Sequence, residues 1–467
     1  MGRLKEKKTH KGKRPCASSL FKKAGRLILF VILSFFIFYT LWLLWSFTSP
    51  ALASRHRLPV LCDPHFRRGD SFTAYLEKEK EYVAVTRQTV YGKKGEDPCP
   101  GLASEKNIQR NLSFYKRPAG SLKGQVLLLH GLSDSPYAMR ALSRYFLNRG
   151  HAVLALRLKG HGSVPGALLN VKYTQWQEQV REASEWLKAC EEDTSLPFFM
   201  AGFSTGAALS LSYTLDIMES GEGDLPEALF FFSPAFRISP AAAVTGLHRP
   251  VSRIPLFQRF AWLDILEDSD PCKYMSFPKN AAWQIYLLSR ENERRLQGHC
   301  SFPVPIYSFQ SACDATVSAC AAVLFYERYG LDGYLTLFDT HPARRGQFKS
   351  SVDVRKIARE WKGPARLFIV TGESGLEGRE MSHVITVPWK DSLFSLSHVA
   401  LPFSVDDPLY NAYETDKQAL WGEKRLFKGE EEVERLRVNP FFKQVTMLLD
   451  QSFIRMADNP SKEQGGS

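Results

Sequence analysis

The chain has 467 residues, of which 44% are hydrophobic and 24% charged, as in a globular protein of one large domain or two domains. The formal net charge is +12, but residues 1–26 alone contribute +9, from ten lysines and arginines and one glutamate. The basic excess is therefore a local tail, and the composition gives no reason to expect a nucleic-acid partner.

An uncharged stretch follows this tail. No charged residue lies between Arg26 and Arg55, and residues 27–47 are apolar enough and long enough to cross a bilayer as a helix. We expect a transmembrane helix, with residues 1–26 as a basic cytoplasmic tail and the rest of the chain outside the cytoplasm, in the periplasm if the source is bacterial. The alternatives are a signal peptide cleaved near Ala53 and a buried helix of a soluble domain.

Seven cysteines follow the apolar stretch, and an extracytoplasmic compartment would allow them to form disulfides. Because seven is an odd number, at least one thiol stays unpaired or pairs between chains. Cys62–Cys99 and Cys272–Cys300 are plausible pairs, and buried free thiols are the alternative. The cysteines show no C-x-x-C spacing of a zinc site.

Residues 48–120 are mixed and polar, and we expect a linker and an extended N-terminal arm with one helix at residues 71–82. From residue 121 onward, apolar strands alternate with amphipathic helices, which predicts an α/β domain over residues 121–450 with a parallel sheet covered on both faces. The polar residues 451–467 are expected to be a C-terminal tail. The expected strands are 125–129, 152–158, 198–201, 228–232, 306–310, 334–338 and 367–370, and the expected helices are 137–148, 173–190, 281–297, 321–329 and 440–456.

Residues 197–211 contain the most informative motif. An apolar run from Phe198 to Ala201 leads into Gly202-Phe203-Ser204-Thr205-Gly206, and a helical sequence follows. A strand, a tight turn with a serine at its apex and a helix form a nucleophile elbow, in which the glycines relieve clashes with neighbouring backbone. Ser204 is therefore the candidate nucleophile.

A serine hydroxyl needs a histidine base and an acid that orients the base. Asp314 follows the strand 306–310 and is the candidate acid, since elbows of this kind have the chain order serine, acid, histidine. We favour His398 as the base because small, uncharged residues surround it. His341 is the rival, although two arginines follow it closely, and His383 looks structural.

The oxyanion of acyl transfer needs two backbone N–H groups, and we expect those of Leu132 and Thr205 to supply them. His130 is expected to orient the loop before Leu132. Residues 236–302 interrupt the alternation of strands and helices, and we interpret them as a cap over the site. The aromatic side chains of this cap, Phe257, Phe260 and Trp262, favour esters with apolar acyl chains. A packed helical excursion without substrate contact is the alternative.

These motifs together resemble the α/β-hydrolase superfamily, in particular its branch of monoacylglycerol lipase and lysophospholipase-like serine hydrolases. The resemblance rests on His130-Gly131-Leu132, Gly160-His161-Gly162, Gly202-Phe203-Ser204-Thr205-Gly206 and Asp314-Ala315-Thr316-Val317. Residues 132–137 and 394–402 are most similar to membrane-anchored bacterial α/β-hydrolases. The resemblance covers about residues 55–450.

The resemblance implies an eight-stranded, mostly parallel sheet, a Ser204–Asp314–His398 triad and no metal or organic cofactor. It implies a membrane-anchored hydrolase of carboxylic esters, with lipid-like substrates, that works through an acyl-enzyme. The 84 residues from Asp314 to His398 exceed what one helix and one strand require, which keeps His341 open. A serine peptidase of the same fold and a catalytically silent binding or scaffold protein are the alternatives.

Overall fold

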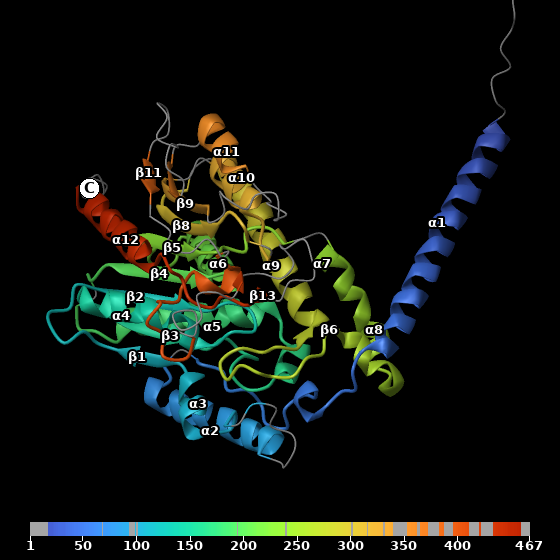
Figure 1. Cartoon of the computed structure of the whole chain (residues 1–467), viewed down its shortest axis with the longest axis horizontal. Coiled ribbons are helices and arrows are strands. Elements are labelled where there is room, and N and C mark those ends of the chain that lie inside the picture. The colour runs from blue at the N-terminus through green and yellow to red at the C-terminus, as the bar shows by residue number, and fades with distance from the viewer. Residues whose placement is uncertain are drawn as a thin grey trace, which may run out of the picture.

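The computed structural model describes residues 17–67, 69–92, 99, 101–193, 195–238, 241–299, 302–314, 316–329, 332–339, 353–361, 365–371, 383–386, 396–410, 420–421 and 433–458. In this part of the chain the central sheet has nine strands, in the order β1-β3-β2-β4-β5-β8-β9-β10-β11 (Figure 1). Neighbours from β3 to β11 are parallel, and β1 pairs antiparallel with β3. The mostly parallel sheet is confirmed, with one strand more than the resemblance implied.

The strands of this sheet are β1 (Phe114–Lys116), β2 (Gly124–Leu129), β3 (His151–Leu156), β4 (Phe198–Phe203), β5 (Ala228–Phe232), β8 (Ile306–Ser311), β9 (Gly333–Asp339), β10 (Arg366–Thr371) and β11 (His383–Thr386). All seven expected strands are present, with ends that differ by one or two residues. β3 ends before Arg157, because the side chain of Arg157 turns into a buried polar cluster and the chain leaves the sheet there.

Successive side chains along each strand enter opposite apolar layers, as the pleat requires. In β2, Leu127 and Leu129 belong to the layer shared with α5, α6 and α10, whereas Val126 and Leu128 belong to the layer shared with α4 and α12. Both faces of the sheet are therefore covered, which explains why the strands are apolar throughout instead of alternating.

The helices that cover the sheet are α4 (Arg140–Asn148), α5 (Tyr173–Ala189), α6 (Thr205–Ser220), α10 (Ala319–Tyr329), α11 (Val354–Glu360) and α12 (Phe442–Ala457). Pro136 opens a separate 3₁₀ turn, η3 (Pro136–Met139), so α4 begins three residues later than expected. The last helix, α12, extends into the segment expected to be a polar tail, because its buried face continues as far as Ser452.

The N-terminal arm is more helical than the expected extended chain. The arm contains the 3₁₀ turn η2 (Ser54–His56) and the helices α2 (Phe72–Tyr91) and α3 (Glu105–Arg110). The 3₁₀ turn η4 (Pro165–Leu169), which lies outside the arm, packs against η2. In Figure 1 these two helices lie below the sheet edge that carries β1. α2 buries aromatic side chains such as Phe72 and Tyr75 in the main core, and it is 20 residues long, so it continues well beyond the predicted end at residue 82.

The interruption at residues 236–302 is a set of short elements and one long helix. The elements are α7 (Ala241–Val244), η5 (Thr245–His248), α8 (Arg249–Ser252), η6 (Pro255–Ala261), β6 (Trp262–Asp264), β7 (Phe277–Pro278) and α9 (Lys279–Leu296). The strands β6 and β7 pair antiparallel outside the main sheet, and a further small pair is formed by β12 (Leu420–Trp421) and β13 (Val433–Glu434).

The expected apolar helix is α1 (Ala17–Trp45), followed by η1 (Ser46–Thr48). It extends away from the rest of the chain and touches it only near its C-terminal end (Figure 1). Its apolar side chains, such as Leu29 and Phe30, are exposed, and so large an exposed apolar surface is unfavourable in water. The stretch Ala24–Thr48 is long and apolar enough to cross a membrane, and a signal sequence would meet the same criteria.

Neither of the two plausible disulfide pairs is present, and the alternative of a buried free thiol holds for Cys272. The thiol of Cys62 is free and exposed, so it does not pair with Cys99, and the thiol of Cys272 is free and buried. Cys272 packs against Tyr137 and Phe403, a setting in which a thiol acts as a small apolar side chain. Cys300 lies outside the described residues.

Candidate active site

The predicted nucleophile elbow is present between β4 and α6. Ser204 adopts φ 54° and ψ −107°, a backbone conformation that is strained for a residue with a side chain. A Cβ on Gly202 would lie 2.3 Å from the backbone nitrogen of Ala207, and one on Gly206 would lie 2.1 Å from the carbonyl oxygen of Leu129. Only glycine fits at either position, so the G-x-S-x-G pattern follows directly from the close approach of strand and helix.

The predicted acid and base lie in contact. The carboxylate of Asp314 accepts a hydrogen bond of 2.8 Å from Nδ1 of His398. The same carboxylate accepts from Nε2 of Gln310 at 2.9 Å and from the amides of Thr316 and Val317 at 2.8 Å each. Four donors therefore fix its two oxygen atoms, and the bond from His398 leaves Nε2 of the imidazole as the nitrogen available to a substrate or a nucleophile.

His398 also reaches the elbow. Its ring packs on Phe203, the residue before Ser204, with the two ring centres 5.1 Å apart. The hydroxyl of Ser233, at the end of neighbouring β5, donates to the carbonyl oxygen of His398 at 3.4 Å. Both His398 and Ser204 are more than nine-tenths buried. The elbow, the acid and the base thus meet at the edge formed by the carboxyl ends of the parallel strands.

The long path from Asp314 to His398 has a structural explanation. After Asp314 the chain forms α10, β9, α11, β10 and β11 before it returns to β8. Two strands, β10 and β11, are thus added beyond β9, and the segment His398–Ala400 (η7) returns to the acid. The rival base, His341, lies outside the described residues. His383 begins β11 and pairs in register with Phe368, consistent with the structural role expected for it.

The loop expected to bind the oxyanion follows β2 and lies against the elbow. A Cβ on Gly131 would meet the ring of Phe203 and the carboxylate of Asp134 at 2.8 Å, so this loop and the elbow are in direct contact. Ser133 has a positive φ of 64°, which gives the loop a sharp turn immediately after Leu132. Leu132 and Thr205 therefore lie on neighbouring turns beside Ser204.

His130 fixes the backbone of this loop. Its Nδ1–H donates to the carbonyl oxygen of Gly131 at 2.8 Å, and its Nε2 accepts from the amide of Leu158 at 3.1 Å. Burial lowers the pKa of His130 to about 3, so the ring stays neutral at pH 7 and can both donate and accept. The ring of His161, from the Gly160-His161-Gly162 motif, packs edge-on against it at 4.9 Å.

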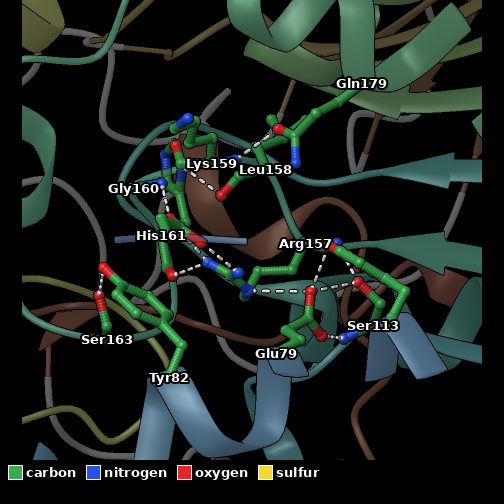
Figure 2. A network of polar contacts seen from close by, with 12 residues as sticks. Glu79, Tyr82, Ser113, Arg157, Leu158, Lys159, Gly160, His161, Ser163 and Gln179 are labelled. Carbon is green, nitrogen blue, oxygen red and sulfur yellow. Dashed lines mark hydrogen bonds and ion pairs between the residues drawn. The ribbon is translucent and has the colours of Figure 1, made fainter. Parts of the chain in front are cut away.

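A buried ion cluster beneath this loop was not found from the sequence. Arg157 forms a bidentate pair with Asp63, at 2.6 and 3.2 Å. Its Nε lies 3.0 Å from Oε1 of Glu79 (Figure 2). Its Nη1 also donates to the carbonyl oxygen of His161 at 2.9 Å. Asp63 and Glu79 belong to the arm, so the cluster joins the arm to the loop that holds His130.

The later part of the cap also contacts the loop after β2. The amide of Tyr274 donates to the carbonyl oxygen of Ser133 at 2.8 Å, and Nζ of Lys273 lies 2.7 Å from Oδ1 of Asp134. Burial lowers the pKa of Lys273, and the carboxylate of Asp134 opposes that shift. This part of the cap is thus fixed directly above the candidate site.

The cap aromatics have a different role from the one expected. The ring of Phe260 packs on that of Trp42 in α1, with the ring centres 4.8 Å apart. The ring centres of Phe257 and Phe47 are 5.7 Å apart, and those of Trp262 and His56 of the arm are 4.9 Å apart. They join the cap to the apolar helix and the arm. They therefore do not support the preference for apolar acyl chains that their composition suggested.

Comparison with known proteins gives the family context for this geometry. Residues 120–340 match the family model described as serine aminopeptidase, S33. This match covers the elbow, the loop after β2 and Asp314, and the strand order places all three on one edge of a parallel sheet. The chain has the α/β-hydrolase fold.

Two curated relatives are a lipase and a carboxylesterase. A thermostable monoacylglycerol lipase of Bacillus sp. (strain H-257) is 34% identical over 18% of this chain and 33% of its own length. A carboxylesterase of Bacillus subtilis (strain 168) is 35% identical over 20% of this chain and 37% of its own. The chain thus spans about a third of the length of these relatives. A solved structure of metagenome-derived lipolytic enzymes matches 49% of this chain and 83% of its own, with 22% identity and a TM-score of 0.39.

Proposed function

We propose that this α/β-hydrolase is a serine esterase with Ser204 as nucleophile, His398 as general base and Asp314 as the acid that orients the base. The observation that supports this most strongly is the hydrogen bond of 2.8 Å between Nδ1 of His398 and the carboxylate of Asp314, which accepts four hydrogen bonds in all. It joins two residues 84 positions apart in the chain, next to a serine in a strained elbow. A purely structural histidine would not need this setting.

The reaction follows from these positions. Nε2 of His398 takes the proton from Oγ of Ser204 as the oxygen attacks the ester carbonyl, and Asp314 stabilises the imidazolium that forms. The N–H groups of Leu132 and Thr205 would donate to the resulting oxyanion. His398 then gives its proton to the leaving alcohol, which leaves an acyl-enzyme on Ser204. Water, deprotonated by the same Nε2, attacks the acyl carbon, and the released Oγ recovers the proton.

We propose carboxylic esters, with lipid-like substrates, as the substrate class. The names of the two relatives, a monoacylglycerol lipase and a carboxylesterase, support ester hydrolysis. The apolar helix α1 would place the site beside a lipid surface. The second candidate is a serine aminopeptidase, because the matching family model has that description and the same triad could cleave either bond.

A substrate panel separates the two candidates. The full-length chain in neutral detergent should hydrolyse p-nitrophenyl esters and monoacylglycerols, and Ser204→Ala should remove this activity by at least a factor of about 10³. Aminoacyl p-nitroanilides should react far more slowly than the esters. Cleavage of the anilides without ester turnover would make the protein a peptidase, and inactivity of the wild type on both classes would indicate a binding or scaffold protein.

We also propose that α1 spans a membrane, with the basic tail in the cytoplasm and the hydrolase domain on the other side. The support is the apolar stretch Ala24–Thr48, 25 residues long, which carries no charge after Arg26 and follows a strongly basic N-terminal segment. A topology reporter fused after residue 60 should be active outside the cytoplasm. The fusion protein should sediment with the membrane fraction after an alkaline wash. A cytoplasmic signal, or a mature N-terminus near Ser54 in the soluble fraction, would contradict the proposal.

A further inference from the structure

A groove lies where the cap, the arm and the C-terminal end of α1 meet. It has a volume of about 770 Å³, and its walls come from the arm around η2, the end of η4 and the cap elements η5, α8 and η6. Leu52, only a few residues beyond the end of η1, forms part of its wall. The groove is therefore separate from Ser204 and Asp314, and no step of the proposed hydrolysis uses it.

The groove is strongly cationic. Arg57, Lys172, Arg249 and Arg253 line it, and none of its lining residues is an aspartate or glutamate. Within the described part of the chain, no ion pair involves any of these four side chains, and Arg249 donates to the neutral side chain of Asn280 at 2.9 Å. Four positive charges thus share one concave surface without internal compensation, which favours an anionic ligand.

The two histidines of the groove do not add charge at neutral pH. Burial lowers the pKa of His56 to about 4, and it also lowers the pKa of His248. Their rings therefore stay neutral at pH 7, and both ring nitrogens of His56 are already hydrogen-bonded, to the amide of Ala53 and to the hydroxyl of Ser276. The attraction for an anion comes from one ammonium and three guanidinium groups, and a guanidinium can hold two oxygen atoms of a phosphate at once.

The position of the groove specifies the source of the anion. Arg259 of η6 donates to the carbonyl oxygens of Phe47 at 3.4 Å and Ser49 at 3.2 Å, and Phe260 packs on Trp42, so the cap is fixed to the end of α1. If α1 spans a membrane, the groove lies at the level of the lipid head groups. The exposed side chains of Ile254 and Leu256, beside Arg253, are apolar contacts that fit the same surface.

We propose that this groove binds the phosphate head group of an anionic phospholipid in the leaflet at the C-terminal end of α1. The inference rests on the proposed membrane span of α1 and is independent of the proposed hydrolysis. Binding would fix the cap, and with it the catalytic domain, at one orientation to the membrane surface. The apolar groups of the groove, such as Leu52 and Trp262, would contact the glycerol backbone and the first carbons of the acyl chains.

The test uses the full-length chain in neutral detergent micelles, with dioleoyl-phosphatidylglycerol and dioleoyl-phosphatidylcholine in equal amounts, and counts retained lipids by native mass spectrometry. The wild type should retain one phosphatidylglycerol in preference to phosphatidylcholine. The double variant R249Q/R253Q should weaken this binding about 10- to 30-fold. The matched variant R290Q/R294Q removes two exposed arginines of α9 and should bind as the wild type does.

Each outcome decides for or against the proposal. Equal retention of the two lipids by the wild type, or equal losses in both double variants, would overturn it. Displacement of phosphatidylglycerol by millimolar inorganic phosphate would identify a site for a free anion and would also overturn it. R57Q/K172Q provides a second pair of groove variants should R249Q/R253Q fail to fold. Turnover of a short soluble ester, measured alongside, should be unchanged in the groove variants, and its absence from the wild type would affect only the proposed hydrolysis.

Discussion

Replacing His398 with alanine should reduce kcat for a short ester by about 10⁴- to 10⁶-fold, nearly as much as Ser204→Ala, because the members of a triad act as one unit. His398 is the histidine whose Nδ1 contacts the carboxylate of Asp314, at 2.8 Å, and whose ring packs on the residue before Ser204. Without it, Oγ of Ser204 loses its proton acceptor and the leaving alcohol loses its proton donor. Single-turnover and steady-state rates on p-nitrophenyl butyrate measure the loss.

His341→Ala is the control for this prediction, since His341 is the rival base in the sequence. It should retain most of the activity, because the carboxylate of Asp314 already has four donors and the imidazole among them is that of His398. The folding of each variant is checked by circular dichroism. An inactive His341→Ala together with an active His398→Ala would reassign the base and make the geometry around Asp314 structural.

The elbow and the apolar strands could be predicted from the sequence because local rules govern them. Gly202 is required by a contact within the strand–turn–helix unit itself, where a Cβ would lie 2.3 Å from the backbone nitrogen of Ala207. Gly206 is required by the close approach of β2, where a Cβ would lie 2.1 Å from the carbonyl oxygen of Leu129. Asp314 could be predicted because it directly follows a strand of a parallel sheet, whose carboxyl ends share one edge. The elbow motif, the apolar strands and Asp314 are each recognised from residues that lie close together in the sequence, although the contact that requires Gly206 is with β2.

The remaining features depend on contacts between distant segments. Nothing near Asp63, Glu79 or Arg157 indicates that these charges meet in the interior, because the pairing requires the arm to fold beneath β3. The sequence suggests that the cap aromatics contact the substrate, because nothing near them in the chain indicates that their partners are Trp42, Phe47 and His56. The pairing of β10 with β11 is likewise non-local, which is why the length of the path to His398 was unexplained.

The buried ion cluster also predicts a large effect on stability. Glu79 is fully buried, and its carboxylate accepts hydrogen bonds from the hydroxyl of Tyr75 at 2.7 Å and from the amide and hydroxyl of Ser113 at 2.6 and 2.9 Å, besides its pair with Arg157. These donors offset the cost of burying the charge. Each member of the cluster is needed, because a buried charge or donor that loses its partner cannot form a hydrogen bond with water instead.

Glu79→Gln should therefore lower the free energy of unfolding by about 3 kcal/mol, since the NH₂ group of glutamine cannot accept the hydrogen bonds that Tyr75 and Ser113 now donate to the carboxylate, and buried donors lose their acceptor. Glu81→Gln is the matched control: it makes the same change two positions along α2 at an exposed residue, where substitutions cost within about 0.5 kcal/mol. Urea unfolding of the full-length chain in detergent, followed by tryptophan fluorescence, compares the two. Equal midpoints for both variants would mean that the cluster does not hold the arm to the loop of His130. A large loss for Glu79→Gln alone would establish the arm as part of the structure that supports the active site.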